Sequence, residues 1–227
     1  MSLMRNKFIF FVLVLFAFNK SIFCEKVIRR IQSDVTEYDR KTNSVNFYGN
    51  VKIEIMNGYI LCQQAYYKEN ENIICEKDVY FVYTSTLGPL DVEIKCLYLY
   101  YDMKNKQIEF KNNIYAIYKS TSYFDTAEYG FSKAEVKCNY INLDTVSSTM
   151  IFKENVVVFT EDTTVFCDFA EYKYKDKFLL VNSDLDKKIK FESLSEKLRI
   201  KTCHAKLATI DFDKQVIILN GKVEIIF

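Results

Sequence analysis

The stretch Phe47-Tyr48-Gly49-Asn50-Val51-Lys52-Ile53 joins two alternating apolar patterns through a short turn. A version of it, Leu219-Asn220-Gly221-Lys222-Val223-Glu224-Ile225, returns at the other end of the chain. Strand starts of this kind recur at intervals of 28, 35, 42, 33 and 34 residues, and they fall at Val51, Val79, Ile114, Val156, Ile189 and Val223. Repeats of this length indicate one small β unit that is used several times.

A second phrase places cysteine at one fixed position of the repeat. In each copy a residue typical of strands stands two places before the cysteine and an apolar residue three places after it, and the four cysteines are Cys62, Cys96, Cys138 and Cys167. An exported chain with six cysteines after Cys24 usually forms disulfides. A shared repeat position instead favours a row of small, buried side chains, since cysteine is among the most buried residue types. We favour buried, reduced cysteines and keep a disulfide framework as the alternative.

Alternation with a period of two residues dominates the chain, and helical periodicity is scarce. Within residues 45–55 the odd positions are apolar or glycine, whereas the even positions include Lys52 and Glu54. Such alternation is typical of a sheet with one covered face and one wet face. Cys62 and Ala65 have opposite parity, which predicts a bulge or corner between them where the strand passes from one sheet to another. The predicted fold class is therefore all-β, an elongated, solenoid-like stack of repeated antiparallel strand units.

The chain is expected to consist of a targeting segment, residues 1–24, and a single domain, residues 25–227. The first segment contains an unbroken apolar run at residues 8–18. A membrane-spanning helix needs about 20 apolar residues, so this shorter run favours a secretory signal peptide. Acylation of Cys24 and retention of the segment as an anchor, because Lys20 lies close to the cleavage point, remain alternatives. We therefore expect an exported, periplasmic protein that is cleaved, lipidated or membrane-associated.

The charge balance argues against a nucleic-acid partner. The whole chain has 31 basic and 30 acidic residues, and removal of residues 1–24 leaves 28 basic against 30 acidic residues. No basic excess is left to neutralise a phosphate backbone.

No pattern typical of an enzyme is found. His204 is the only histidine, and the chain contains no paired Cys-x-x-Cys that would suggest a metal site. The nucleotide-binding, nucleophile-elbow and zinc-protease motifs are also missing. The sequence therefore predicts neither catalysis nor a metal or other cofactor.

Four successive phrases resemble the repeat of the OstA-like family, to which LptA and LptC belong. They are Ser33-Asp34-Val35-Thr36-Glu37-Tyr38-Asp39, then residues 45–48, then Gly49-Asn50-Val51-Lys52-Ile53, then residues 60–67. The resemblance implies a twisted β-jelly roll, V-shaped in section, that carries lipopolysaccharide through the periplasm in an apolar cleft. It also implies end-to-end association through edge strands and contact with inner- and outer-membrane transport components. Cysteine, lysine and asparagine replace the Ala-Asp pairs common in the family, so the resemblance does not identify the lipid.

We therefore predict a lipid-transport protein that holds the acyl chains of a lipopolysaccharide or another glycolipid. An acyl chain gains about 0.8 kcal/mol for each methylene that it buries, so an apolar groove can hold it without specific polar chemistry. The expected cleft residues lie at the apolar positions of the alternating pattern in the matched strands: Phe47, Val51, Ile53, Phe110, Ile114, Phe152, Val156, Val158, Val223 and Ile225.

Two other hypotheses belong to different classes of protein. The first is a structural β-solenoid scaffold whose interior is fully packed and carries no lipid. The second is a small outer-membrane β-barrel, because alternating aromatic strands that end at Phe227 resemble an assembly signal. Open strand edges are expected near residues 27–31 and at the C-terminal end, and open edges recruit partner strands unless they are blocked.

Overall fold

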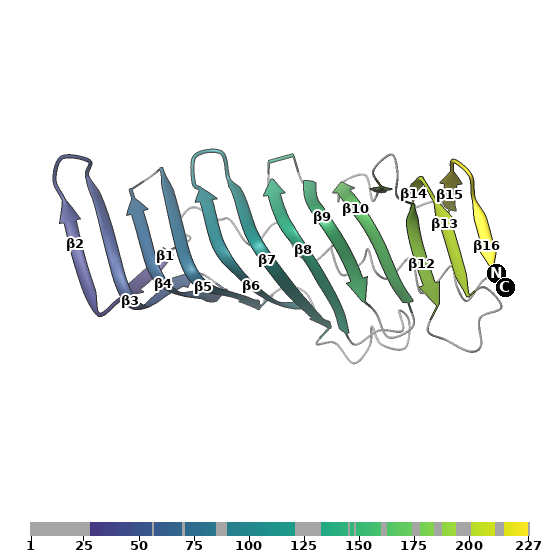
Figure 1. Cartoon of the computed structure of the whole chain (residues 1–227). Helices are drawn as coiled ribbons and strands as arrows, with labels where there is room; N and C mark the ends of the chain where they lie inside the picture. The colour runs from purple at the N-terminus through teal and green to yellow at the C-terminus, as the bar shows by residue number, and fades with distance from the viewer. Residues whose placement is uncertain are drawn as a thin grey trace.

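The computed structural model describes residues 28–226, except residues 56, 70, 85–89, 121–132, 145, 148, 160–162, 174–177, 184–187, 194–200 and 212–215. The predicted targeting segment, residues 1–24, lies outside the described residues. The described part contains a single antiparallel sheet of 16 strands, which confirms the all-β prediction (Figure 1).

The strands fall into two length classes. Strands β3 to β10 have 11 to 14 residues, and the others have three to five. In chain order they are β1 (Ile28–Gln32), β2 (Val35–Asp39), β3 (Ser44–Ile55), β4 (Gly58–Lys68), β5 (Asn72–Thr84), β6 (Leu90–Asp102), β7 (Gln107–Ser120), β8 (Lys133–Asp144), β9 (Thr149–Phe159), β10 (Thr163–Lys173), β11 (Phe178–Asn182), β12 (Ile189–Ser193), β13 (Thr202–Ala205), β14 (Leu207–Asp211), β15 (Val216–Asn220) and β16 (Glu224–Ile226).

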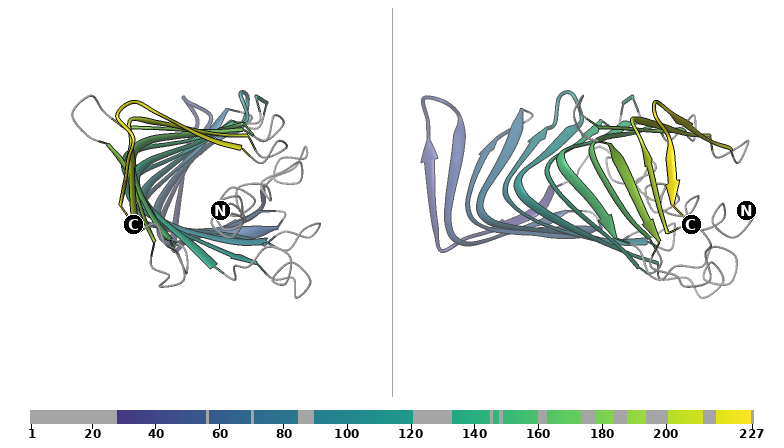
Figure 2. Two further views of the ribbon diagram at one scale, coloured as in Figure 1. Left: turned by 90° about the vertical axis from the view of Figure 1, so that its right-hand side faces the viewer. Right: turned by 45° about the vertical axis from the view of Figure 1, so that its right-hand side comes forward.

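The long strands bend in the middle, so that the sheet forms two walls that meet at a corner (Figure 2). Strands β3 to β10 pair in sequence order and contribute one half to each wall. At the two ends, short strands continue each wall separately. We call the wall that contains β2, β11, β14 and β15 wall A, and the wall that contains β1, β12, β13 and β16 wall B.

Within the described residues the sheet is open. Its first strands, β1 and β2, pair only with β3 there, and its last strands pair only with β13 and β14. The two sets lie at opposite ends of an elongated and twisted molecule (Figure 1). The predicted open edges at both ends are therefore confirmed.

A bulge produces each corner. Two consecutive residues with positive φ on one strand face a single residue on the neighbouring strand, and every long strand shows a register shift there. Such bulges bend a strand and increase its twist. The residue pairs with positive φ are Gly49-Asn50, Lys77-Asp78, Asn112-Asn113, Glu154-Asn155 and Gly221-Lys222. The bulge predicted between Cys62 and Ala65 is confirmed, because the β4–β5 register shifts between Leu61 and Gln64.

The repeating cysteines lie beside these corners and point inward. Each pairs with the first residue after the positive-φ pair of the adjoining strand: Val51 with Cys62, Val79 with Cys96, Ile114 with Cys138 and Val156 with Cys167. All four are buried. The prediction of a row of small core side chains is confirmed.

The inner faces of the two walls pack against each other in a single core. Phe81 of wall B and Phe110 of wall A meet edge to face, with ring centroids 5.4 Å apart. Both side chains are at most 2% exposed. Edge-to-face rings add about 0.5–1.5 kcal/mol to the gain from area burial. The interior at this point is therefore filled by protein side chains.

Candidate functional site

Eight of the ten predicted cleft residues lie together in the core between the walls. Their exposed fractions run from 0% to 9%, and they are Phe47, Val51, Ile53, Phe110, Ile114, Phe152, Val156 and Val158. The other two lie at the C-terminal end, where Val223 is 44% and Ile225 is 43% exposed. The structure thus brings eight of them into one apolar interior and places two on an open edge.

This interior extends along the sheet, and the two walls that line it are joined only at the corner. Among the described residues, no strand of wall A pairs with a strand of wall B other than through the strands that continue around the corner. Buried apolar residues line the interior from β3 to β14. A guest acyl chain would need the walls to separate, since contacts such as that between Phe81 and Phe110 fill the space between them.

The outer faces carry charged and aromatic side chains that bond to one another. On wall B, Lys52 pairs with Glu54 at 2.9 Å, and Tyr80 donates a hydrogen bond to Glu93 at 2.7 Å. Glu93 also pairs with Lys119 at 2.5 Å. Both partners, first Lys119 and then Tyr80, lower the pKa of Glu93. The alternation of wet and covered faces predicted for residues 45–55 is confirmed here.

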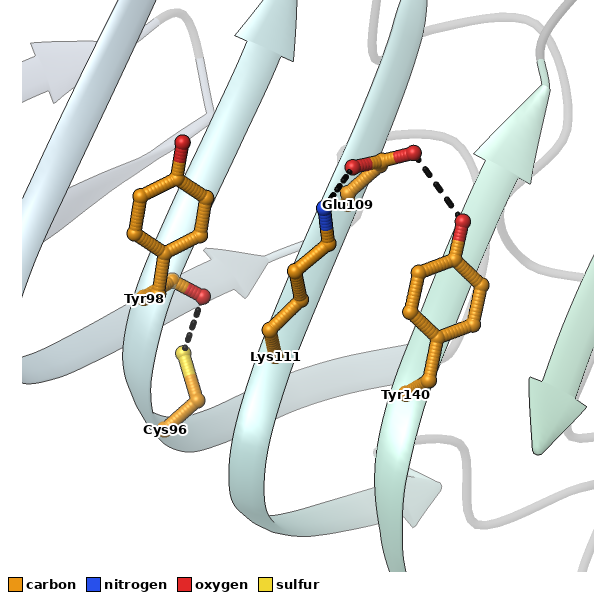
Figure 3. Close-up of polar contacts among 5 residues, drawn as sticks. All are labelled: Cys96, Tyr98, Glu109, Lys111 and Tyr140. Carbon is orange, nitrogen blue, oxygen red and sulfur yellow. Dashed lines mark hydrogen bonds and ion pairs between the residues drawn. The ribbon is translucent and has the colours of Figure 1, made fainter. Parts of the chain in front are cut away.

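A comparable cluster lies on wall A beside the corner (Figure 3). Lys111 pairs with Glu109 at 2.5 Å and lies 5.6 Å and 5.8 Å from the ring centroids of Tyr98 and Tyr140. Tyr140 donates to Glu109 at 3.0 Å, and burial followed by this bond raises the pKa of Tyr140 to about 12. Cys96 donates to the carbonyl oxygen of Tyr98 at 3.3 Å. These groups satisfy one another, so the cluster stabilises the surface and offers no reactive group.

Most of the buried thiols are poorly suited to nucleophilic chemistry. Burial raises the pKa of Cys96, Cys138 and Cys167 to about 12. Cys75 and Cys62 share a sulfur–sulfur hydrogen bond, which lowers the pKa of Cys62 and raises that of Cys75. The thiolate is the reactive form of cysteine, so raised pKa values favour inert core residues.

One surface depression on the outer side of wall B has a volume of about 410 Å³. Arg29, Lys52 and Tyr59 contribute to its lining. The ammonium of Lys52 pairs with Glu54 and lies 5.9 Å from the Tyr59 ring centroid. The charge of this lysine is therefore already balanced within the protein.

The described residues contain no group of three or more His, Cys, Asp or Glu side chains that could hold a metal ion. They also contain no helix long and apolar enough to cross a membrane.

Exposed apolar side chains gather at the two ends of the sheet. Of the nine large apolar residues that are exposed in the described part, six lie on or beside the terminal strands: Val35, Tyr38, Ile218, Val223, Ile225 and Ile226. The cleft prediction included only Val223 and Ile225 of this set.

The terminal corners carry opposite charges, which the cleft prediction missed. Asp34 lies between β1 and β2 and is exposed, and Lys222 lies between β15 and β16 and is exposed. The sequence contained a signal for the second residue, because Lys222 stands where the first copy of the phrase has Asn50. Lysine is an unusual residue for a position with positive φ.

Comparison with known proteins adds a distant structural likeness. No protein-family model matches the chain, and no curated protein matches it. Among solved structures, the chain is similar to LptH of Pseudomonas aeruginosa, described as the LptA-homologous periplasmic component of the lipopolysaccharide transport device. The identity is 11%, the match covers 76% of this chain and 92% of that chain, and the TM-score is 0.30. The fold assignment rests on the strand order described above.

Proposed function

We propose that this chain is an exported lipid-transport protein that carries the acyl chains of a glycolipid between its two walls. The observation that carries the proposal is the apolar interior, which runs along the sheet between walls that are joined only at the corner. The residues that would contact the lipid are the eight buried members of the predicted cleft. The OstA-like phrases at residues 33–67 support a lipopolysaccharide-like cargo.

Loading requires the walls to move apart around the corner. The bulges supply the bend in each strand, and hydrogen bonds within each wall can persist while the opening widens. An entering acyl chain would replace side-chain contacts across the interior with its own, and it would recover about 0.8 kcal/mol for each methylene buried. The acyl chain would therefore occupy the core between the walls. It would not lie in a groove that is already open.

The two open edges support a bridging role. A strand edge with unpaired backbone groups can accept another strand. We propose that copies of the chain, or transport components of the inner and outer membranes, extend the two walls end to end. The exposed apolar residues at both ends support this association, because pairing with a further strand would cover them.

Lipid extraction tests the proposal. The full chain is exported in a cell with lipopolysaccharide, purified without detergent and extracted with organic solvent, and the acyl chains are quantified by mass spectrometry. We expect glycolipid at a reproducible molar ratio to protein. A protein that is free of lipid and that takes up none when lipopolysaccharide is added would contradict the proposal.

The second candidate function is a structural scaffold without cargo. The burial of the eight cleft residues, at 0% to 9% exposure, favours this candidate because a filled core leaves no room for a guest. The same extraction separates the two, since the scaffold associates end to end but carries no lipid.

A further inference from the structure

The first and last bent strands of the chain run in opposite directions. β1 lies in wall B and β2 in wall A, so the first bent strand runs from wall B to wall A. β15 lies in wall A and β16 in wall B, so the last bent strand runs from wall A to wall B. When the end of one copy meets the start of another, the two strands are antiparallel and each wall continues into the same wall of the next copy.

Each terminal corner has a neighbouring strand on one side only. Three interior corner residues, Gln63, Leu97 and Asn139, each lie between positive-φ pairs on both neighbouring strands. Asp34 has such a pair only on β3, where its backbone N–H donates to the Gly49 carbonyl at 3.0 Å and Asn50 Nδ2 donates to its carboxylate at 2.8 Å. At the other end, the pair Gly221-Lys222 has a corner residue on one side only, Lys206, whose N–H donates to the Asn220 carbonyl at 3.0 Å.

We propose that Lys222 of one copy pairs with Asp34 of the next, and that this corner contact fixes the polarity and the register of end-to-end assembly. The inference rests on the proposed bridging function and names its partner as a second copy of this chain. Asp34 would contact Gly221-Lys222 of the preceding copy as it contacts Gly49-Asn50 within its own chain. Within the described residues, Lys222 has no ion-pair partner, so its charge is available for this contact.

The register that follows covers exposed apolar residues at the joint. Inside the chain, Val51 pairs with Cys62 and Ile53 with Ile60 on either side of the interior corner. In the contact between two copies, the same register places Val223 of one copy beside Ser33 of the next, and Ile225 beside Ile31. Ile225, now 43% exposed, would then face the interior under a further strand, as Ile53 does.

Charge disfavours the two symmetric alternatives. A two-fold pairing of C-terminal ends would bring Lys222 against Lys222, and a two-fold pairing of N-terminal ends would bring Asp34 against Asp34. Like charges that face each other across a contact suppress that arrangement. Glu224, two residues after Lys222, pairs with Lys188 of its own chain at 3.5 Å.

Charge-reversal variants of the full chain test the proposal, with self-association measured by sedimentation equilibrium at low salt. Lys222→Glu and Asp34→Lys should each weaken association about tenfold, because each places two like charges against each other. The double variant should restore association, because its two charges are again opposite. Asp34→Asn keeps the hydrogen-bonding capacity toward Asn50 and should weaken association less. Lys104→Glu, the same charge change in the exposed turn between β6 and β7, is the matched control and should have no effect.

Cysteine cross-linking reports the polarity independently. The combination of Ser33→Cys and Val223→Cys should give ladders of disulfide-linked oligomers, whereas either single variant should give no linked dimer. Linked dimers from one single variant would show a symmetric joint and overturn the proposal. Association that is unchanged in both charge variants would overturn the corner contact and leave end-to-end bridging intact. A wild-type chain that stays monomeric would overturn both, while lipid extraction would still test the cargo.

Discussion

Asparagine and aspartate, together with a few lysines and a glutamate, take the backbone conformations that many proteins assign to glycine. The chain has only five glycines, yet ten residues other than glycine have positive φ in the part that the structure describes, and most of them lie at corners. Asparagine and aspartate tolerate this region because their short side chains bond the local backbone. Gly49 is needed for a second reason: a Cβ there would lie 2.5 Å from a carboxylate oxygen of Asp34.

Replacing a strained corner residue with glycine should therefore stabilise the protein. Lys77 has φ 62° in the β5 corner and is exposed. Left-handed conformations cost a residue with a side chain about 1 kcal/mol, so we expect Lys77→Gly to raise the free energy of unfolding by up to about 1 kcal/mol. Glu76→Gly, one residue earlier in regular strand geometry, should lower it by a similar amount. Urea denaturation of both variants checks the pair, and a destabilised Lys77→Gly protein would refute the strain argument.

The buried face of each strand was largely predictable, because the alternation of apolar and polar residues indicates which side of a strand is covered. The change of parity between Cys62 and Ala65 located a corner, and the alternation in residues 45–55 assigned Lys52 and Glu54 to the wet face. Parity does not determine the distance between two walls, so the sequence could not show that Phe81 and Phe110 fill the interior. The division of the last bent strands into short pieces was also missed, since the repeat spacing gives no sign of it.

The contact between the walls predicts different effects for inward and outward aromatic residues of β7. Phe110→Ala removes a fully buried ring and should lower the free energy of unfolding by about 3–5 kcal/mol. Tyr115→Ala removes an outward ring that bonds Glu135 at 2.6 Å and should cost about 1 kcal/mol. Chemical denaturation monitored by circular dichroism measures both changes. Equal losses would mean that the walls do not pack on each other through Phe110.

At the scale of the whole molecule, the structure is an open, bent sheet with an apolar interior and two ends that carry exposed apolar side chains. The interior and the ends serve different parts of the proposed function, since acyl chains would occupy the first and neighbouring copies the second. The sequence located the interior through its parity and anticipated open edges. It did not show that the exposed charges of Asp34 and Lys222 lie at opposite ends, because that placement depends on the number and direction of the strands between them.

Photo-cross-linking within β7 tests the central claim most directly. A photoreactive amino acid replaces either Phe110, which is buried between the walls, or Lys111, which lies on the outer face (Figure 3). The two positions are adjacent in sequence, so expression, export and exposure to lipid are matched. After irradiation of living cells, we predict lipid adducts from position 110 and none from position 111. Adducts from both positions alike, or from neither, would contradict the claim that acyl chains travel between the walls.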